Sequence, residues 1–361
     1  MQQHTVRSLR LASAVLIAAL LVLAGLGIYA ASRQGMEDDV MVCGDFRLSN
    51  TQLAYYYWSE YFYFAGAYGE YLDGVVDLTV PLDQQAYSDE QTWQDYLLDE
   101  ALSTVRETMA MVFRAQEEGF TLSAQGETDL AEVLESFRTA AEENGYADLE
   151  AYLAASYGPG ATEESFTDYL RCAHLAAEYA DSLFEAIAPT EAEIREYYEA
   201  HAGEYLENYG VTREDGPMPH GVYLPFDSWG EAQAVYDDFL EGGATHDLLN
   251  NLGAANLGQT GELEEVTPDS VGEAAEAWFY DESRQSGDHA VVTEEDGSAA
   301  ICYFVSAGQR TYWQRLAEDD LRHETYQNQY LTIVNANTFY VNYDKIRITA
   351  PEGLYETQSA G

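Results

Sequence analysis

Apolar side chains recur at intervals of three and four residues through the first half of the chain, from Asp45 to Ala188. This is the spacing of helices that bury one face. Ser or Thr precedes several of these stretches and Gly follows them, as is typical of helix starts and ends. After a short strand at 42–46, the pattern predicts helices over residues 50–72, 92–118, 123–144, 148–157, 162–187 and 190–209.

The pattern changes after Gly210, where Gly and Pro become frequent and apolar residues begin to alternate with polar ones. A turn cluster at 216–219 separates the two regions. The second region and the tail predict strands at 220–226, 290–293, 299–305 and 340–348, and helices at 229–241, 245–252, 274–280 and 313–330.

Together these elements predict a mainly α-helical domain over residues 40–210 and a small α+β domain over residues 216–308. Residues 309–348 are expected to return to the helical domain, because the apolar face of the helix at 313–330 has no partner inside the small domain. Residues 349–361 are expected to form a flexible tail.

An uncharged stretch, Leu11–Ala31, lies close to the N-terminus. A helix of roughly 20 apolar residues crosses the hydrocarbon core of a bilayer. Arg7 and Arg10 precede this stretch, so the positive-inside rule predicts a cytoplasmic N-terminus over residues 1–10 and export of the remainder. A cleaved signal peptide is the alternative, since the small residues at 30–32 suit a signal peptidase. We predict a retained transmembrane helix at 11–31, and a secreted protein if this segment is cleaved.

Charge restricts the classes of partner. The chain has 64 acidic residues against 16 Lys and Arg, a formal net charge of −48, and a single lysine, Lys345. Nucleic-acid binding requires a basic surface that displaces counterions, so this composition excludes it. Hydrophobic residues make up 47% and aromatic residues 13% of the chain, which is enough to form a core. The acidic surface is expected to keep the protein soluble.

Motifs for catalysis or metal binding are absent from the sequence. The three cysteines, Cys43, Cys172 and Cys302, are widely spaced, which leaves one disulfide or three separate thiols open. Histidines at zinc-hydrolase spacing, phosphate-binding glycine loops and Ser-nucleophile motifs are missing. The sequence therefore predicts no cofactor and no metal ion.

The predicted helix at 50–72 is rich in aromatic residues. An aromatic stripe at helical spacing is typical of core packing. It also suits a peptide-binding surface, since tyrosine combines a large contact area with a polar tip. The candidate peptide-binding residues are Tyr56, Tyr57, Tyr61 and Phe64.

The order of several segments resembles a known family. The helix at 92–118 carries a W-x-x-x-L-x-x-x-A-L pattern, an A-x-x-x-G-F-x-L-S turn follows it, and the stretch at 188–205 reads APTEAEIREYYEAHAGEY. With the strand at 42–46, these segments resemble the SurA-type N-terminal chaperone domain of exported foldases, over roughly residues 40–205. The resemblance implies a helical domain that binds unfolded polypeptides.

In that family a parvulin-type prolyl isomerase domain usually follows, and residues 216–308 resemble a degenerate copy of it through the segments 239–253 and 277–304. Active parvulins carry one histidine in the first strand and a second in the last strand. His220 is the candidate for the first, and Ala300 occupies the place of the second. The resemblance thus implies a domain that keeps the fold and contacts substrate, in which His220 is catalytic only if the domain is active.

We therefore predict a membrane-anchored, extracytoplasmic chaperone or foldase-like protein that binds unfolded or nascent exported polypeptides without isomerase activity. Two alternatives remain: an active parvulin-type peptidyl-prolyl cis-trans isomerase, and a non-catalytic scaffolding ectodomain. The surroundings of His220 distinguish the enzyme, because an isomerase needs an apolar, proline-sized pocket flanked by polar groups.

Overall fold

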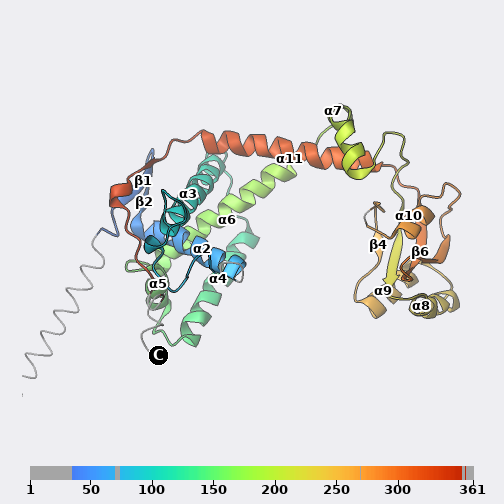
Figure 1. Cartoon of the computed structure of the whole chain (residues 1–361), viewed down its shortest axis with the longest axis horizontal. Coiled ribbons are helices and arrows are strands. Elements are labelled where there is room, and N and C mark those ends of the chain that lie inside the picture. The colour runs from blue at the N-terminus through green and yellow to red at the C-terminus, as the bar shows by residue number, and fades with distance from the viewer. Residues whose placement is uncertain (1–34, 70–73, 269, 352–353, 355–361) are drawn as a thin grey trace, which may run out of the picture. The chain divides into compact units, whose positions relative to one another are not determined.

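The computed structural model describes residues 35–69, 74–268, 270–351 and 354. The predicted anchor at Leu11–Ala31 and most of the predicted tail at 349–361 lie outside these residues. Within them, no helix is both long enough and apolar enough to cross a membrane. The chain divides into two compact units, one formed by the residues up to Ala186 together with those from Tyr326 onwards, the other by Ile187–Thr325 (Figure 1).

The body of the first unit is helical, and α2 lies at its centre, packed against α3, α5 and α6. Tyr55, Tyr57 and Trp58 of α2 are among the largest fully buried side chains of the described residues. The helices of this unit that were expected from the apolar spacing are all present. Their bounds are α2 (Asn50–Tyr68), α3 (Trp93–Glu117), α4 (Ala124–Glu143), α5 (Leu149–Tyr157) and α6 (Glu163–Glu185), with a short 3₁₀ turn, η2 (Leu82–Gln84), before α3.

Local capping determines where these helices begin and end. Ser49, Thr92 and Thr162 each accept a hydrogen bond from the backbone three residues ahead, and the side chain of that third residue bonds back to the cap. Gly119 and Gly145 follow α3 and α4 with φ of 71° and 76°, a conformation that a side chain disfavours. Because these signals lie within a few residues of each boundary, the sequence predicts the boundaries well.

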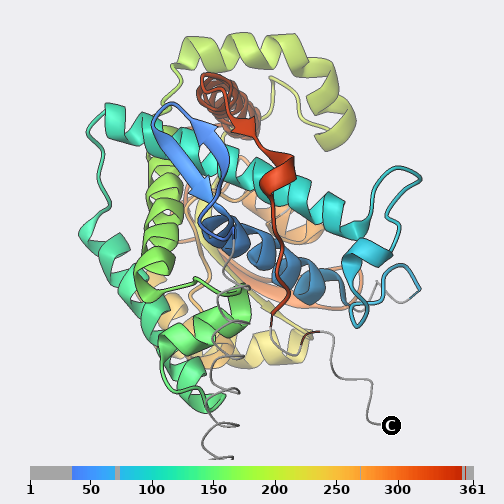
Figure 2. The same cartoon turned by 90° about the vertical axis from the view of Figure 1, so that its left-hand side faces the viewer.

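The C-terminal segment returns to the start of the first unit. β1 (Asp39–Cys43) lies between β2 (Phe46–Ser49) and β7 (Tyr340–Val341) in a three-stranded antiparallel sheet. Beyond β7 the chain runs alongside α2 (Figure 2), where Trp58 Nε1 donates a hydrogen bond to the carbonyl of Thr349 at 3.0 Å. The last part of the chain therefore completes the helical unit.

The strand predicted at 340–348 is wrong beyond Val341. A 3₁₀ turn, η3 (Tyr343–Lys345), follows β7. The backbone N–H of Arg347 then donates to Oδ1 of Asn50 at 2.8 Å. Since a buried side chain satisfies this backbone group, the segment needs no neighbouring strand. The apolar residues at 346 and 348 pack against the helical core.

In the second unit, α7 (Glu191–Tyr209) packs against the first part of α11 (Tyr312–Asn335) around a small core that contains Tyr198, Tyr205 and Trp313. The sequence grouped the residues of α7 with the helical domain at 40–210. The structure groups them with the second unit, because their apolar face meets α11, which comes much later in the chain.

The rest of the second unit is a four-stranded antiparallel sheet in the order β4-β3-β6-β5. Helices cover both faces: α8 and α9 pack on the side chains of Val222 and Ile301, and α10 packs on those of Ala300 and Cys302. β4 was not predicted, since two residues are too few to show an alternating pattern. The bounds are β3 (His220–Phe226), α8 (Trp229–Glu241), α9 (His246–Leu257), β4 (Glu262–Leu263), α10 (Glu273–Phe279), β5 (His289–Thr293) and β6 (Ala299–Ser306).

Candidate functional site

The predicted peptide-binding residues lie on α2, and the structure places most of them inside the first unit. Tyr56, Tyr57 and Tyr61 are only 5%, 1% and 3% exposed. Phe64 is partly buried against the same core. This corrects the expectation of a surface at these positions: α3, α5 and α6 cover α2, so the stripe packs the core.

An exposed aromatic surface exists at the far end of α2. Five side chains, here called the aromatic cluster, contact one another in series: Phe64, Tyr68, Tyr87, Trp93 and Tyr96. Ring centroids lie 5.9 Å apart for Phe64 and Tyr68, 5.2 Å for Phe64 and Trp93, and 4.4 Å for the stacked pair Tyr87 and Tyr96. Tyr68 is 49% and Tyr87 is 45% exposed, whereas Trp93 is 7% exposed. The cluster therefore has a buried base and an open rim.

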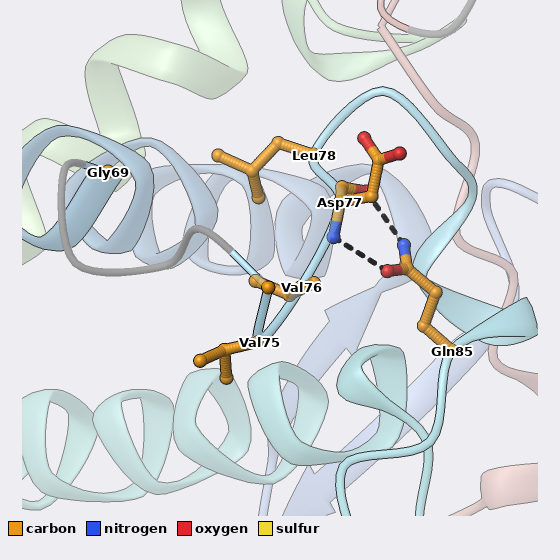
Figure 3. Close-up of a pocket in the computed structure, with 7 residues that line it drawn as sticks. Gly69, Val75, Val76, Asp77, Leu78 and Gln85 are labelled. Atoms are coloured by element: carbon orange, nitrogen blue, oxygen red, sulfur yellow. Dashed lines mark hydrogen bonds between the residues drawn. The ribbon is translucent and has the colours of Figure 1, made fainter.

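Tyr87 reaches this cluster from the loop between α2 and α3. Gln85 organises the loop: its Nε2 donates to the carbonyls of Asp77 (2.7 Å) and Val80 (2.9 Å), and its own backbone carbonyl accepts from the N–H of Trp93 (3.0 Å). Figure 3 shows the Gln85 amide turned toward the backbone of Asp77. The loop also borders a hollow of about 650 Å³, lined by Gly69, Gly74, Val75, Val76, Asp77, Leu78 and Gln85.

The surroundings of the aromatic cluster are acidic. Between Arg47 and Arg106 the sequence contains no Lys, Arg or His. Burial raises the pKa of the Tyr96 hydroxyl, and the nearby carboxylates of Glu100 and Glu60 raise it further. The negative charges of these two carboxylates therefore interact with the tyrosines of the cluster.

A second polar site surrounds His220 at the start of β3. The carboxylate of Glu262, on β4, lies 2.5 Å from Nε2 of His220 and 2.6 Å from Nε2 of His246. Asn250, one turn along α9 from His246, donates to the same carboxylate. We call these four residues the His–Glu cluster. The side chains of His220 and Glu262 are 31% and 27% exposed, so the bonds form in a partly buried environment.

The ionisation of Glu262 follows from these contacts. Burial by itself would raise the pKa of this carboxyl group. Hydrogen bonds from Asn250 and His220, with the charge and hydrogen bond of His246, outweigh burial and hold the pKa below its ordinary value. Glu262 is thus the anionic centre that orients both imidazole rings.

The register of β3 and β6 separates His220 from Ala300. His220 pairs with Ser306, and Ala300 pairs with Pro225 at the other end of the ladder. Six residues along a strand span about 20 Å. Ala300 therefore does not lie where a histidine would join His220, and the second imidazole at His220 comes from His246 of α9 instead.

Glu262, His246 and Asn250 were not predicted from the sequence. His246 and Asn250 are four residues apart on a helix, a spacing that places them on one face and that the sequence does contain. No local pattern connects them to Glu262, because β4 is brought beside α9 only by the fold. The arrangement is a partly buried polar network in which one carboxylate holds two imidazole rings in fixed orientations.

Neither a metal site nor a disulfide occurs in the part of the chain that the structure describes. No group of three or more His, Cys, Asp or Glu side chains is placed to hold a metal ion there. Cys43, Cys172 and Cys302 are free thiols, the second of the two possibilities that the sequence left open. Burial raises the pKa of both Cys172 and Cys302, so these thiols resist ionisation.

The fold defines a helical unit that is completed by its own C-terminal segment, with an antiparallel α+β unit inserted in the chain between the two parts. No family model and no curated protein matches this chain. Among solved structures, the foldase protein PrsA from Lactococcus lactis is similar, with 12% identity and a TM-score of 0.37, covering 85% of this chain and 96% of that one.

Two further solved structures are similar at comparable levels. PrsA from Bacillus subtilis has 14% identity and a TM-score of 0.33, covering 71% of this chain and 92% of that one. One of two SurA-like chaperones from Campylobacter jejuni has 8% identity and a TM-score of 0.27, covering 68% and 88%. These are the classes of protein that the sequence motifs resemble.

Proposed function

We propose that this chain is a chaperone or foldase-like protein that binds unfolded or nascent polypeptides. The aromatic cluster carries the proposal, because Tyr68 and Tyr87 leave nearly half of their surface open above a buried Trp93. Grouped aromatic side chains provide the large apolar contact area that an unfolded chain recognises. The resemblance of residues 40–205 to SurA-type chaperone domains supports the same function.

The net charge is compatible with an exposed apolar surface. At −48 the molecules repel one another, which opposes association through the aromatic cluster. A client chain would have to carry its own apolar groups into the cluster. This combination favours transient capture of unfolded segments over self-association.

The exposed tyrosines of the cluster provide the test. The full chain is expected to suppress aggregation of a chemically denatured test protein that is diluted into buffer, as followed by light scattering. The Tyr68→Ser/Tyr87→Ser variant should need about tenfold more protein for the same effect, since it loses two aromatic contacts of roughly 0.5–1.5 kcal/mol each. Its thermal stability should fall by no more than the loss of a few ring contacts, and it should remain folded at the assay temperature, because both side chains are about half exposed.

Tyr343→Ser is the matched control. Tyr343 is 57% exposed and lies on η3, outside the aromatic cluster. This variant should suppress aggregation as well as the original chain. Undiminished suppression by the folded Tyr68→Ser/Tyr87→Ser variant would contradict the proposal.

A prolyl isomerase is the second candidate, and the His–Glu cluster is the observation that favours it. Rotation about a peptide bond has a barrier of about 18–20 kcal/mol, which preorganised polar groups can lower. We nevertheless expect no activity, because Nε2 of both imidazoles already bonds to Glu262. Faster cis–trans exchange of an X-Pro peptide that disappears in His220→Ala would establish the enzyme instead. A protein that captures only folded partners would support the scaffolding alternative.

We also propose that Leu11–Ala31 anchors the protein in a membrane, with the residues that follow it on the extracytoplasmic side. The support is the sequence: 11–31 is uncharged and follows Arg7 and Arg10. N-terminal sequencing of the membrane fraction should find a mature chain that still contains Arg7. A mature chain that starts near Ser32 would mean a cleaved signal and a secreted protein.

A further inference from the structure

Resting on the proposed chaperone function, we propose that the aromatic cluster selects cationic client segments. Its occupant is an extended stretch of unfolded polypeptide in which Lys or Arg stands beside aromatic or aliphatic residues. Client segments that carry acidic residues at the same positions bind more weakly. Three features of the first unit support this selectivity.

The first feature is the form of the rim. Tyr87 stacks on Tyr96 with 4.4 Å between ring centroids and an angle of 19° between the ring planes. Tyr68 and Tyr87 are close to half exposed. The face of an aromatic ring attracts a guanidinium or ammonium group, and the attraction increases as water is excluded. A cluster with half-exposed tyrosine rings therefore favours Arg and Lys among charged client residues.

The second feature is the position of carboxylates beside these rings. Glu100 follows Tyr96 by four residues on α3, so the two side chains share one face of the helix. Glu60, at the facing part of α2, accepts a hydrogen bond from Thr104 at 2.8 Å and is fixed between the helices. Both carboxylates also influence the Tyr96 hydroxyl electrostatically. A cation on the tyrosine rim would therefore lie within the field of two carboxylates.

The third feature is the lack of local counter-charge. Elsewhere in the first unit arginines neutralise carboxylates, as in the pairs Arg171 with Glu127 and Arg138 with Glu163. The sequence from 48 to 105, which holds the whole cluster, has no basic residue. A client cation would supply the charge that the segment itself lacks. Exposed carboxylates that are not paired repel an acidic client by the same interaction.

Labelled peptides of about twelve residues measure the selectivity on the full chain by fluorescence anisotropy. One peptide alternates Phe or Leu with Arg, its matched partner carries Glu at every Arg position, and a third carries Ser there. The Arg peptide should bind at least ten times more tightly than the Glu peptide at low salt. The ratio should fall as salt rises, because ions screen the interaction beyond about 10 Å at 0.1 M. Equal affinity for the Arg and Glu peptides would overturn the inference.

Charge variants locate the selectivity. Glu60→Gln/Glu100→Gln removes the two carboxylates beside Tyr96 and should weaken binding of the Arg peptide about fivefold, in line with partly exposed ion pairs. The control is Glu132→Gln/Glu143→Gln, two exposed positions on α4, which changes the net charge equally and should leave affinity unchanged. Equal losses in both double variants would attribute selectivity to net charge and overturn the inference.

The outcomes distinguish this inference from the proposed function. Suppression of aggregation that depends on Tyr68 and Tyr87, with equal binding of all three peptides, would leave the chaperone function in place and remove the charge selectivity. Failure of the full chain to bind any peptide or to suppress aggregation would remove both.

Discussion

Asn50 links the N-terminal and C-terminal segments of the helical unit through its side-chain amide. It is fully buried at the start of α2. Its Nδ2 donates to the carbonyls of Gly35 (2.8 Å) and Lys345 (2.9 Å), and its Oδ1 accepts from the N–H of Arg347 (2.8 Å). One amide thus satisfies backbone groups from both ends of the unit. A buried polar side chain is stabilising in such a position only because every one of its groups has a partner.

Replacing this residue tests the closure. Asn50→Ala should lower the free energy of unfolding by about 3 kcal/mol, since three hydrogen bonds are lost and buried backbone groups remain without partners. Urea unfolding followed by circular dichroism measures the change. The control is Asn144→Ala, an exposed residue after α4, which should cost no more than about 0.5 kcal/mol. Similar losses for the two variants would mean that the C-terminal segment is not held through Asn50.

Among the elements, the two-residue strand β4 determines how the His–Glu cluster is assembled. It pairs with β3 only at Gly221 and Val222. It nevertheless places Glu262 between His220 of β3 and His246 of α9. The carboxylate therefore connects three elements, β3, β4 and α9. We therefore expect this edge of the sheet to be more stable when Glu262 is ionised than when it is protonated.

The pH dependence has a definite sign. The pKa of Glu262 in the folded chain lies below its ordinary value, so the ionised group stabilises the fold at neutral pH. This contribution is lost as the pH falls through the lowered pKa. Glu262→Gln should therefore reduce stability at pH 7 by about 1–3 kcal/mol, and the difference from the original chain should shrink toward pH 3. Urea unfolding at several pH values, with the exposed Glu132→Gln as control, measures it. A difference that stays constant with pH would contradict this account.

At the scale of the whole molecule, 64 acidic residues against 16 Lys and Arg leave most carboxylates without a cationic partner in the chain. Tyrosine hydroxyls bind several of them. Tyr205 donates to Asp320 at 2.6 Å, and Tyr330 donates to Glu107 at 2.5 Å. Burial and the adjacent carboxylate raise the pKa of the Tyr205 hydroxyl, so it remains a donor well above neutral pH. Partly buried carboxylates are thus satisfied without adding lysine or arginine.

The candidate sites were only partly predictable, as particular residues show. Phe64 was predicted to bind peptides and belongs to the aromatic cluster, whereas Tyr56 and Tyr57, of the same chemical type on the same helix, are buried. Tyr87 joins the cluster from a loop that carries no periodic pattern. His220 was identified from the resemblance to parvulins, but its partner Glu262 comes from a strand too short to detect. In each case the deciding contact joins residues that are distant in the sequence.

The sequence by itself determined the helices from 50 to 209, their capped ends, the change to an α+β pattern after Gly210 and the acidic character of the segment from 48 to 105. These features depend on side-chain spacing and on hydrogen bonds within a few residues, which the sequence contains directly. Only the tertiary structure decided which aromatic side chains are covered, which imidazole meets His220, and that α7 packs with α11. Those outcomes depend on burial and on pairing between distant segments, whose free energies arise only when the chain has folded.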